Sequence, residues 1–150
     1  MWRSKSASQA NARQPCKSDR LTQDRKIAED VSTAPKEKNV IIDCFAGAGG
    51  NAIAFALSGR WNQIFAVEKD EKTLACAKHN AEVYGVSKKI FWIHGDIFEV
   101  LQKILKAALK KAVVFGSPPW GGMSMPTLQL VTKITQLTRH RSYIHRLRGL

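Results

Sequence analysis

The clearest chemical signal in the sequence is a glycine-rich segment at residues 43–51, Asp-Cys-Phe-Ala-Gly-Ala-Gly-Gly-Asn. It follows the short apolar run 40–42 and precedes a helical pattern, so it predicts a strand–turn–helix unit that holds a nucleotide-containing cofactor. Residues 47–52 also satisfy the G-x-G-x-x-A spacing of dinucleotide sites. Glu68 follows about 20 residues later, where a carboxylate accepts hydrogen bonds from both hydroxyls of a ribose. Two classes of cofactor fit these residues.

Two further acids separate the two classes. Asp43 lies four residues before the first glycine, where a carboxylate repels a pyrophosphate and attracts the ammonium and sulfonium of S-adenosylmethionine. Asp96 follows the third predicted strand and offers an acceptor for an adenine amine. For any one acid alone, capping of a loop or helix is the favoured explanation. Asp43, Glu68 and Asp96 at three successive strand ends favour the methyl donor.

The segment 117–122, Ser-Pro-Pro-Trp-Gly-Gly, indicates a binding site for a base. Its two prolines fix the backbone and remove two donors, so the carbonyls of Ser117 and Pro118 are free to accept from an exocyclic amine. Trp120 offers a face for stacking, and a cationic base would gain about 0.5 to 2 kcal/mol from cation–π attraction. The alternative is an ordinary proline turn with a packed tryptophan.

The elements that must position these residues alternate along the chain. Apolar runs predict strands at 40–42, 64–67, 90–93 and 112–115, and helical patterns cover 51–58, 70–84 and 98–110. This order predicts an α/β fold with a parallel sheet and right-handed crossovers. Ligands of such sheets bind beyond the carboxyl ends of the strands, which is where the acids and residues 117–122 follow.

Length and composition set the remaining bounds. The chain has 150 residues, 44% of them hydrophobic, and a formal net charge of +12, which fits one domain with a basic character. We expect a disordered basic arm at 1–23, which either contacts nucleic acid or is solvated, a domain at 24–126 and a divergent basic tail at 127–150.

Three cysteines without C-x-x-C spacing argue against a disulfide framework, and four histidines without ligand spacing do not support a metal. No apolar run is long enough to cross a membrane, so we expect a soluble intracellular protein, with a monomer favoured.

The residues 43–51, the stretch Asn-Ala-Glu-Val-Tyr-Gly at 80–85 and the segment 117–122 together resemble the trimethylguanosine synthase family of RNA cap guanine-N2 methyltransferases. Residues 26–29 are similar to the short helix that precedes the first strand in that family. The resemblance implies a Rossmann-like fold and methyl transfer from S-adenosylmethionine to N2 of the 7-methylguanosine cap of small nuclear and nucleolar RNA, in the nucleus or nucleolus, giving a 2,2,7-trimethylguanosine cap. The cofactor residues that it implies are Asp43, Phe45, Gly47, Gly49, Asn51, Glu68 and Asp96. Ser117, Pro118 and Trp120 would bind the cap and serve catalysis, without a metal.

The sequence departs from the family after residue 122. A complete methyltransferase sheet needs more residues than remain, so we expect an incomplete fold of about four strands followed by one basic amphipathic helix. The apolar residues of that helix would be Leu130, Ile134, Leu137, Ile144 and Leu147. Two other functions stay open: another RNA guanine or adenine amino methyltransferase, or an inactive fragment that binds the cap or the cofactor.

Overall fold

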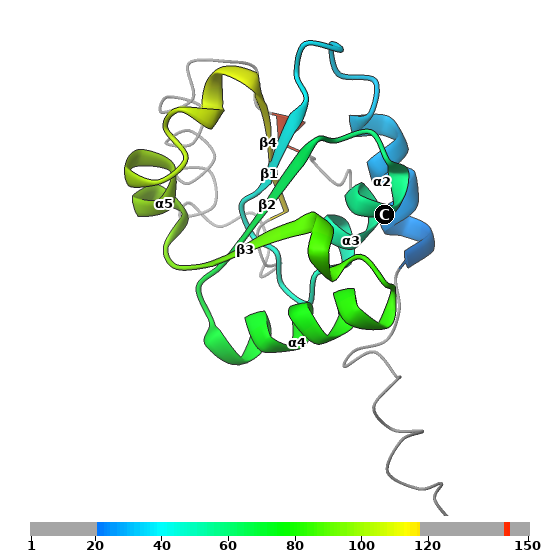
Figure 1. Cartoon of the computed structure of the whole chain (residues 1–150), viewed down its shortest axis with the longest axis vertical. Coiled ribbons are helices and arrows are strands. Elements are labelled where there is room, and N and C mark those ends of the chain that lie inside the picture. The colour runs from blue at the N-terminus through cyan, green and yellow to red at the C-terminus, as the bar shows by residue number, and fades with distance from the viewer. Residues whose placement is uncertain (1–20, 118–142, 145–150) are drawn as a thin grey trace, which may run out of the picture.

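The computed structural model describes residues 21–117 and 143–144. Its strands form one parallel sheet in the order β3-β2-β1-β4-β5 (Figure 1). The strands are β1 (Val40–Asp43), β2 (Gln63–Glu68), β3 (Ile90–His94), β4 (Ala112–Gly116) and β5 (Tyr143–Ile144). All residues of β1 and β4 are buried, as expected for central strands of a parallel sheet. The predicted α/β fold and its first four strands are confirmed.

Helices cover both faces of the sheet and make three layers (Figure 1). One face packs against α2 (Leu21–Val31), α3 (Gly50–Ser58) and the end of α4 (Glu71–Val83), and the other packs against α5 (Ile97–Lys103). Alternate strand residues therefore enter different clusters: Ile41 faces α2 and α3, whereas Ile42 faces α5. The helix that the family resemblance predicts at 26–29 is the middle of α2.

Local signals in the sequence account for the ends of α3 and α4. Gly59 ends α3 with a φ of 67°, which is the left-handed cap that glycine adopts at little cost. Asp70 begins α4, where its carboxylate accepts a hydrogen bond of 2.7 Å from the amide of Thr73. The predicted helices at 51–58 and 70–84 are thus confirmed to within one residue at each end.

The predicted helix at 98–110 is wrong in its second half. Helix α5 ends at Lys103, and a separate 3₁₀ turn, η3, covers Ala108–Lys111. The amide of Leu105 bonds the carbonyl of Val100, five residues back, so the chain leaves the α-helical path at this point. Leu105 turns into the core, whereas Ile104 is 62% exposed. Ile104 and Leu105 are both apolar, so the apolar spacing fitted a continuous helix and could not show that only Leu105 enters the core.

The predicted C-terminal helix is also corrected at the residue that the structure describes. Ile144 lies in β5, which pairs with β4 in parallel with Gly116 opposite Ile144. The sheet therefore has a fifth strand where we expected four strands and a helix. The backbone groups of β4 explain this pairing, because an unpaired edge of a sheet accepts another strand. The other residues of the predicted helix, Leu130, Ile134, Leu137 and Leu147, lie outside the described residues, as do residues 1–20 of the predicted arm.

The sheet register gathers the loops at two opposite edges. Val40 lies opposite both Gln63 and Ala112, and Ile64 lies opposite Ile90, so four strands begin side by side. We call the side where the strands begin the amino edge and the side where they end the carboxyl edge. The loops that follow β1, β2 and β3 lie at the carboxyl edge, as does Ser117 directly after β4.

Candidate functional site

The glycine loop leaves β1 at the carboxyl edge and turns directly into α3. Gly47 and Gly49 have φ values of 54° and 90°, in the region that favours glycine. A Cβ on Gly49 would also lie only 3.1 Å from the ring of Trp92 and 3.2 Å from the Cβ of Ala77. The second glycine is therefore required by conformation and by packing, while the space at Gly47 is open.

Glu68 ends β2 and connects the glycine loop to the next loop along the edge. Its Oε2 accepts a 2.9 Å hydrogen bond from the amide of Gly47, and its Oε1 accepts one of 2.9 Å from the amide of Asp70. The side chain is half-buried. Each carboxylate oxygen can accept more than one hydrogen bond, so the predicted role toward ribose hydroxyls is compatible with these contacts. The structure adds that Glu68 shapes the glycine loop.

Asp43 is the most unusual group at this edge. Its side chain is completely buried, Oδ1 accepts a hydrogen bond of 3.2 Å from the amide of Phe45, and Oδ2 has no hydrogen-bond partner among the described residues. Burial raises the pKa of Asp43 to about 7; the Phe45 amide opposes this, and the charges of Asp24 and Glu68 add to it. The sequence pattern indicated an ordinary carboxylate at this position. In the structure it is a buried acceptor whose charged form a nearby cation would stabilise.

Two residues at this site were not predicted. Asp24, in α2, lies against Gly50 at the start of α3 and raises the pKa of Asp43 through its charge. Asn80, in α4, is buried and its Nδ2 donates to the carbonyl of Ala48 at 2.9 Å, which anchors the glycine loop. A buried amide on an otherwise apolar helix face is a signal that could have identified Asn80. No local pattern indicates Asp24, because its contact depends on how α2 packs.

The third predicted acid, Asp96, takes the position of a helix cap. Its Oδ1 accepts a 3.0 Å hydrogen bond from the amide of Phe98 at the start of α5, and its Oδ2 lies 3.6 Å from the ammonium of Lys69. The capping interpretation therefore applies to Asp96, which still lies at the same edge as Asp43 and Glu68. A role in cofactor binding stays a prediction for this residue.

The remaining predicted site residues divide by position. Phe45 is partly buried and packs against the cluster on the α5 face of the sheet, and Asn51 lies in the first turn of α3 with its Oδ1 buried and without a partner among the described residues. Ser117 follows β4 directly and is half-buried. Because Asp43 lies opposite Phe115 in the register, Ser117 is at the same edge as Asp43. Pro118 and Trp120 lie outside the described residues.

The acceptor groups at this edge fit one kind of ligand. Asp43 Oδ2 and Asn51 Oδ1 are buried acceptors that no described residue contacts by a hydrogen bond, and Glu68 adds a second carboxylate. Such groups suit a ligand that brings ammonium, sulfonium and hydroxyl groups, and they disfavour a phosphate. The described residues contain no group of three or more potential metal ligands. No helix in the described part of the chain has the length and apolar content needed to span a membrane.

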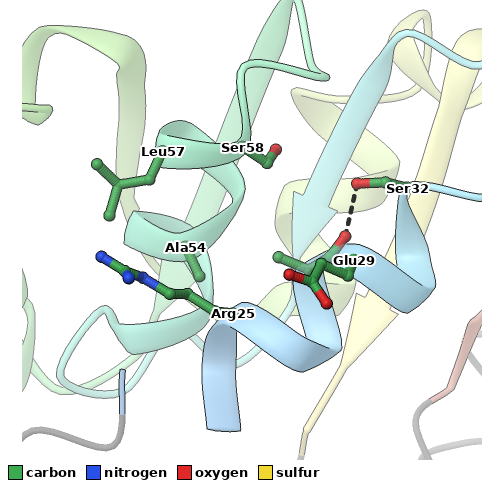
Figure 2. Close-up of a pocket in the computed structure, with 7 residues that line it drawn as sticks. Arg25, Glu29, Ser32, Ala54, Leu57 and Ser58 are labelled. Carbon is green, nitrogen blue, oxygen red and sulfur yellow. Dashed lines mark hydrogen bonds between the residues drawn. The ribbon is translucent and has the colours of Figure 1, made fainter. Parts of the chain in front are cut away.

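A cavity of about 600 Å³ lies elsewhere, between α2 and α3 (Figure 2). Arg25 and Glu29 line it from α2, and Leu57 and Ser58 line it from α3. Ser32 also lines it, but its hydroxyl donates to the carbonyl of Ala28 at 2.6 Å. None of the carboxyl-edge loops contributes to this cavity, so it is separate from the candidate site.

The geometry of the carboxyl edge agrees with the relatives of this chain. Residues 38–138 match the RNA cap guanine-N2 methyltransferase family. This chain belongs to that family. The match includes the glycine loop, Glu68, Asp96 and the segment 117–122. As a member of a methyltransferase family, the chain has S-adenosylmethionine as its implied methyl donor.

Two curated relatives in the family are trimethylguanosine synthases. The chain is 39% identical over 89 residues to that of Schizosaccharomyces pombe, which covers 59% of this chain and 36% of the relative. It is 37% identical over 96 residues to that of Saccharomyces cerevisiae, which covers 64% of this chain and 30% of the relative. The chain thus spans about a third of the length of these two proteins.

Solved structures agree on the fold of this family member. A tRNA methyltransferase from M. jannaschii superposes with a TM-score of 0.57 at 21% identity, covering 83% of this chain and 34% of the other. A SAM-dependent methyltransferase from Agrobacterium tumefaciens superposes with a TM-score of 0.54 at 20% identity, covering 66% of this chain and 31% of the other. At such identities the likeness shows the methyltransferase fold and no more.

Proposed function

We propose that this chain carries the S-adenosylmethionine site of an enzyme that methylates N2 of the 7-methylguanosine cap of small nuclear and nucleolar RNA, in the nucleus. The observation that carries the proposal is the buried Asp43 beside the glycine loop, whose Oδ2 has no hydrogen-bond partner in the described part of the chain and whose pKa is raised to about 7. A cation placed against a buried acid of this kind favours its charged form. Membership in the cap guanine-N2 family supports the same cofactor.

S-adenosylmethionine supplies the methyl group and its positive charge. Toward it, Asp43 would accept from the ammonium, Glu68 would accept from the ribose hydroxyls, and Asp96 would accept from the adenine amine. Glu68 already fixes the loop through the Gly47 amide, so the loop is in place before a ligand binds. This arrangement avoids part of the cost of ordering a loop on binding.

The substrate side of the site would be built by the segment that follows β4. The carbonyls of Ser117 and Pro118 would accept the hydrogens of the N2 amine and orient its nitrogen, and Trp120 would stack on the base. The 7-methyl group makes the guanine cationic, so stacking on tryptophan includes a cation–π contribution. The proton of the amine passes to solvent after transfer, because Asp43, Glu68 and Asp96 are assigned to the cofactor and Asp70 caps α4.

Two variants with opposite effects test this assignment. Trp120→Ala should weaken binding of a 7-methylguanosine cap analogue by about tenfold, from loss of about 1 to 2 kcal/mol of stacking, and leave S-adenosylhomocysteine binding unchanged. Glu68→Gln should do the reverse, because it removes the charge and one acceptor at the ribose position. Both affinities are measured by calorimetric titration. Trp120→Phe is the matched control and should retain most of the cap affinity.

The alternative methylation targets give different results in the same titrations. An enzyme for an uncapped RNA would bind S-adenosylhomocysteine but show no preference for the methylated over the unmethylated cap analogue. A folded chain that binds neither ligand would contradict the proposal altogether. Reversal of the effects of Trp120→Ala and Glu68→Gln would show that the two halves of the site are assigned the wrong way round.

A further inference from the structure

The amino edge of the sheet carries a concentration of positive charge that the methyl-transfer site does not use. The loops that enter β1, β2, β3 and β4 cover residues 35–39, 59–62, 84–89 and 104–111. They contain a single acid, Glu37, and eight basic residues: Lys36, Lys38, Arg60, Lys88, Lys89, Lys106, Lys110 and Lys111. At the opposite edge, the loops at 43–49, 68–70 and 94–96 contain four acids and one lysine.

Two of these basic side chains hold the loops in fixed positions. The guanidinium of Arg60 donates to the carbonyls of Ala34, Pro35 and Lys38 at 3.0 to 3.2 Å. The ammonium of Lys38 donates to the carbonyl of Lys110 at 2.8 Å. The loops before β1, β2 and β4 are therefore tied together, so the charges that they carry are organised before any partner binds.

The other six lysines point their charge to solvent. We call Lys36, Lys88, Lys89, Lys106, Lys110 and Lys111 the amino-edge platform; all six are exposed, and none forms an ion pair with another described residue. Neighbouring strands of a sheet lie about 4.8 Å apart, so the loops before β1 and β4 are adjacent, and the loop before β3 lies two strand spacings from the loop before β1. Like charges held this close repel one another, and a polyanion relieves that repulsion.

An exposed aromatic ring accompanies the platform at its β3 end. Phe91 is the second residue of β3, directly after Lys88, Lys89 and Ile90, and is 54% exposed. One face of its ring stacks on Phe65 with a centroid distance of 5.2 Å, which fixes its orientation. Lysines beside an exposed, oriented aromatic ring are the combination that binds single-stranded nucleic acid, through phosphates and through base stacking.

We propose that the amino-edge platform binds the phosphate backbone of single-stranded RNA at a distance from the methyl-transfer site, with Phe91 as a stacking position for a base. RNA is favoured over other polyanions because Phe91 adds a surface that a base fits. If the proposed function holds, this RNA is the part of the capped substrate that follows the cap. That identification rests on the proposed function, whereas RNA binding by the platform does not. The strands between the two edges have four to six residues, or about 13 to 20 Å, a separation that a chain of several nucleotides can cross.

The test compares two triple variants that remove the same charge. The platform variant carries Lys89→Gln, Lys110→Gln and Lys111→Gln, and the control carries Lys26→Gln, Lys72→Gln and Lys78→Gln at exposed lysines of α2 and α4. The probe is an unstructured, uncapped 15-nucleotide RNA, titrated between 50 and 200 mM salt. With about 0.7 in slope for each phosphate contact on a single strand, the platform variant should lower the slope of log affinity against log salt by about 2.

The expected loss of RNA affinity at low salt is on the order of tenfold or more for the platform variant and less than twofold for the control, and Phe91→Ala should weaken binding without changing the salt slope. Equal losses in the two triple variants would overturn the proposal, as would a wild-type chain that does not bind this RNA. The proposal would also be overturned if the platform variant lost binding to anionic lipid vesicles but kept its affinity for RNA.

Binding of a cap analogue by the same proteins separates the two proposals. Both triple variants should bind the cap analogue with the affinity of the wild type. A wild type that binds the uncapped RNA through the platform but not the cap analogue would contradict the proposed function and leave the platform standing. A wild type that binds the cap analogue but gains no affinity from an attached RNA would contradict the platform proposal and leave the proposed function standing.

Discussion

The two edges of this sheet are built from the same strands but carry opposite charges in opposite environments. At the carboxyl edge, Asp43 is buried with an oxygen that no described group satisfies, and Glu68 bonds the glycine loop. At the amino edge, the platform lysines are exposed, and Arg60 and Lys38 satisfy backbone carbonyls. A buried group without a partner carries an energetic cost that a ligand can remove, whereas an exposed charge carries almost none. The comparison indicates a specific cofactor site at one edge and a salt-sensitive surface at the other.

The largest expected effect comes from neutralising the buried acid with Asp43→Asn. The folded-state pKa of Asp43 is about 7, above the ordinary value of 3.8, so the folded chain holds this proton where the unfolded chain has lost it. The contribution of Asp43 to wild-type stability therefore falls as pH rises from about 4 to 7, by about 1.4 kcal/mol per pH unit. The variant lacks this dependence, so its stability relative to wild type should rise by on the order of 4 kcal/mol across that range.

Urea unfolding of both proteins between pH 4 and pH 8 measures this difference, in which the titration of all other groups cancels. Asp70→Asn is the control, because the Thr73 hydrogen bond lowers the pKa of Asp70. That variant should be the less stable one at neutral pH, and its difference from wild type should vanish below the pKa of Asp70. A flat difference for Asp43→Asn would show that Asp43 is not held as a buried, protonatable acid.

A smaller effect is expected from a pair of glycines, one at each edge. Gly49 and Gly59 flank α3, and both have positive φ values. Alanine at Gly59 meets nothing within 4 Å, so only the backbone strain of about 1 kcal/mol should appear. Alanine at Gly49 also meets Trp92 and Ala77 at 3.1 to 3.2 Å, and its cost should reach about 2 to 3 kcal/mol. Equal losses of the free energy of unfolding in thermal melts would contradict the close packing of the glycine loop.

The parts of this molecule that the sequence could predict are those controlled by neighbours along the chain. The run at 40–42, the glycines and Asp70 determined strand, turn and cap within a few residues of themselves. Asp43 and Glu68 were found because strand ends in a parallel sheet meet at one edge. The family resemblance was found from three segments and is confirmed by the match over residues 38–138.

The parts that could not be predicted depend on packing between distant segments. The contact of Asp24 with the start of α3, and the hydrogen bond from Asn80 to Ala48, join segments 26 and 32 residues apart. The end of α5 at Lys103 depends on whether Ile104 or Leu105 enters the core, which the apolar spacing cannot show. The raised pKa of Asp43 depends on burial, which a sequence pattern does not reveal.

We expect the ionised form of Asp43 to receive the charged end of the methyl donor, and a single pH-dependent titration tests this claim. S-adenosylhomocysteine is titrated into the wild type and into Asp43→Asn at pH 7.5 and at pH 6. With the pKa of Asp43 at about 7, wild-type affinity should fall by about eightfold between these values as the carboxylate is protonated. The variant should bind more weakly than the wild type at both pH values, and its affinity should change little between them. Any effect of pH on the ligand itself would appear in the variant as well. Equal wild-type affinity at the two pH values would contradict the claim.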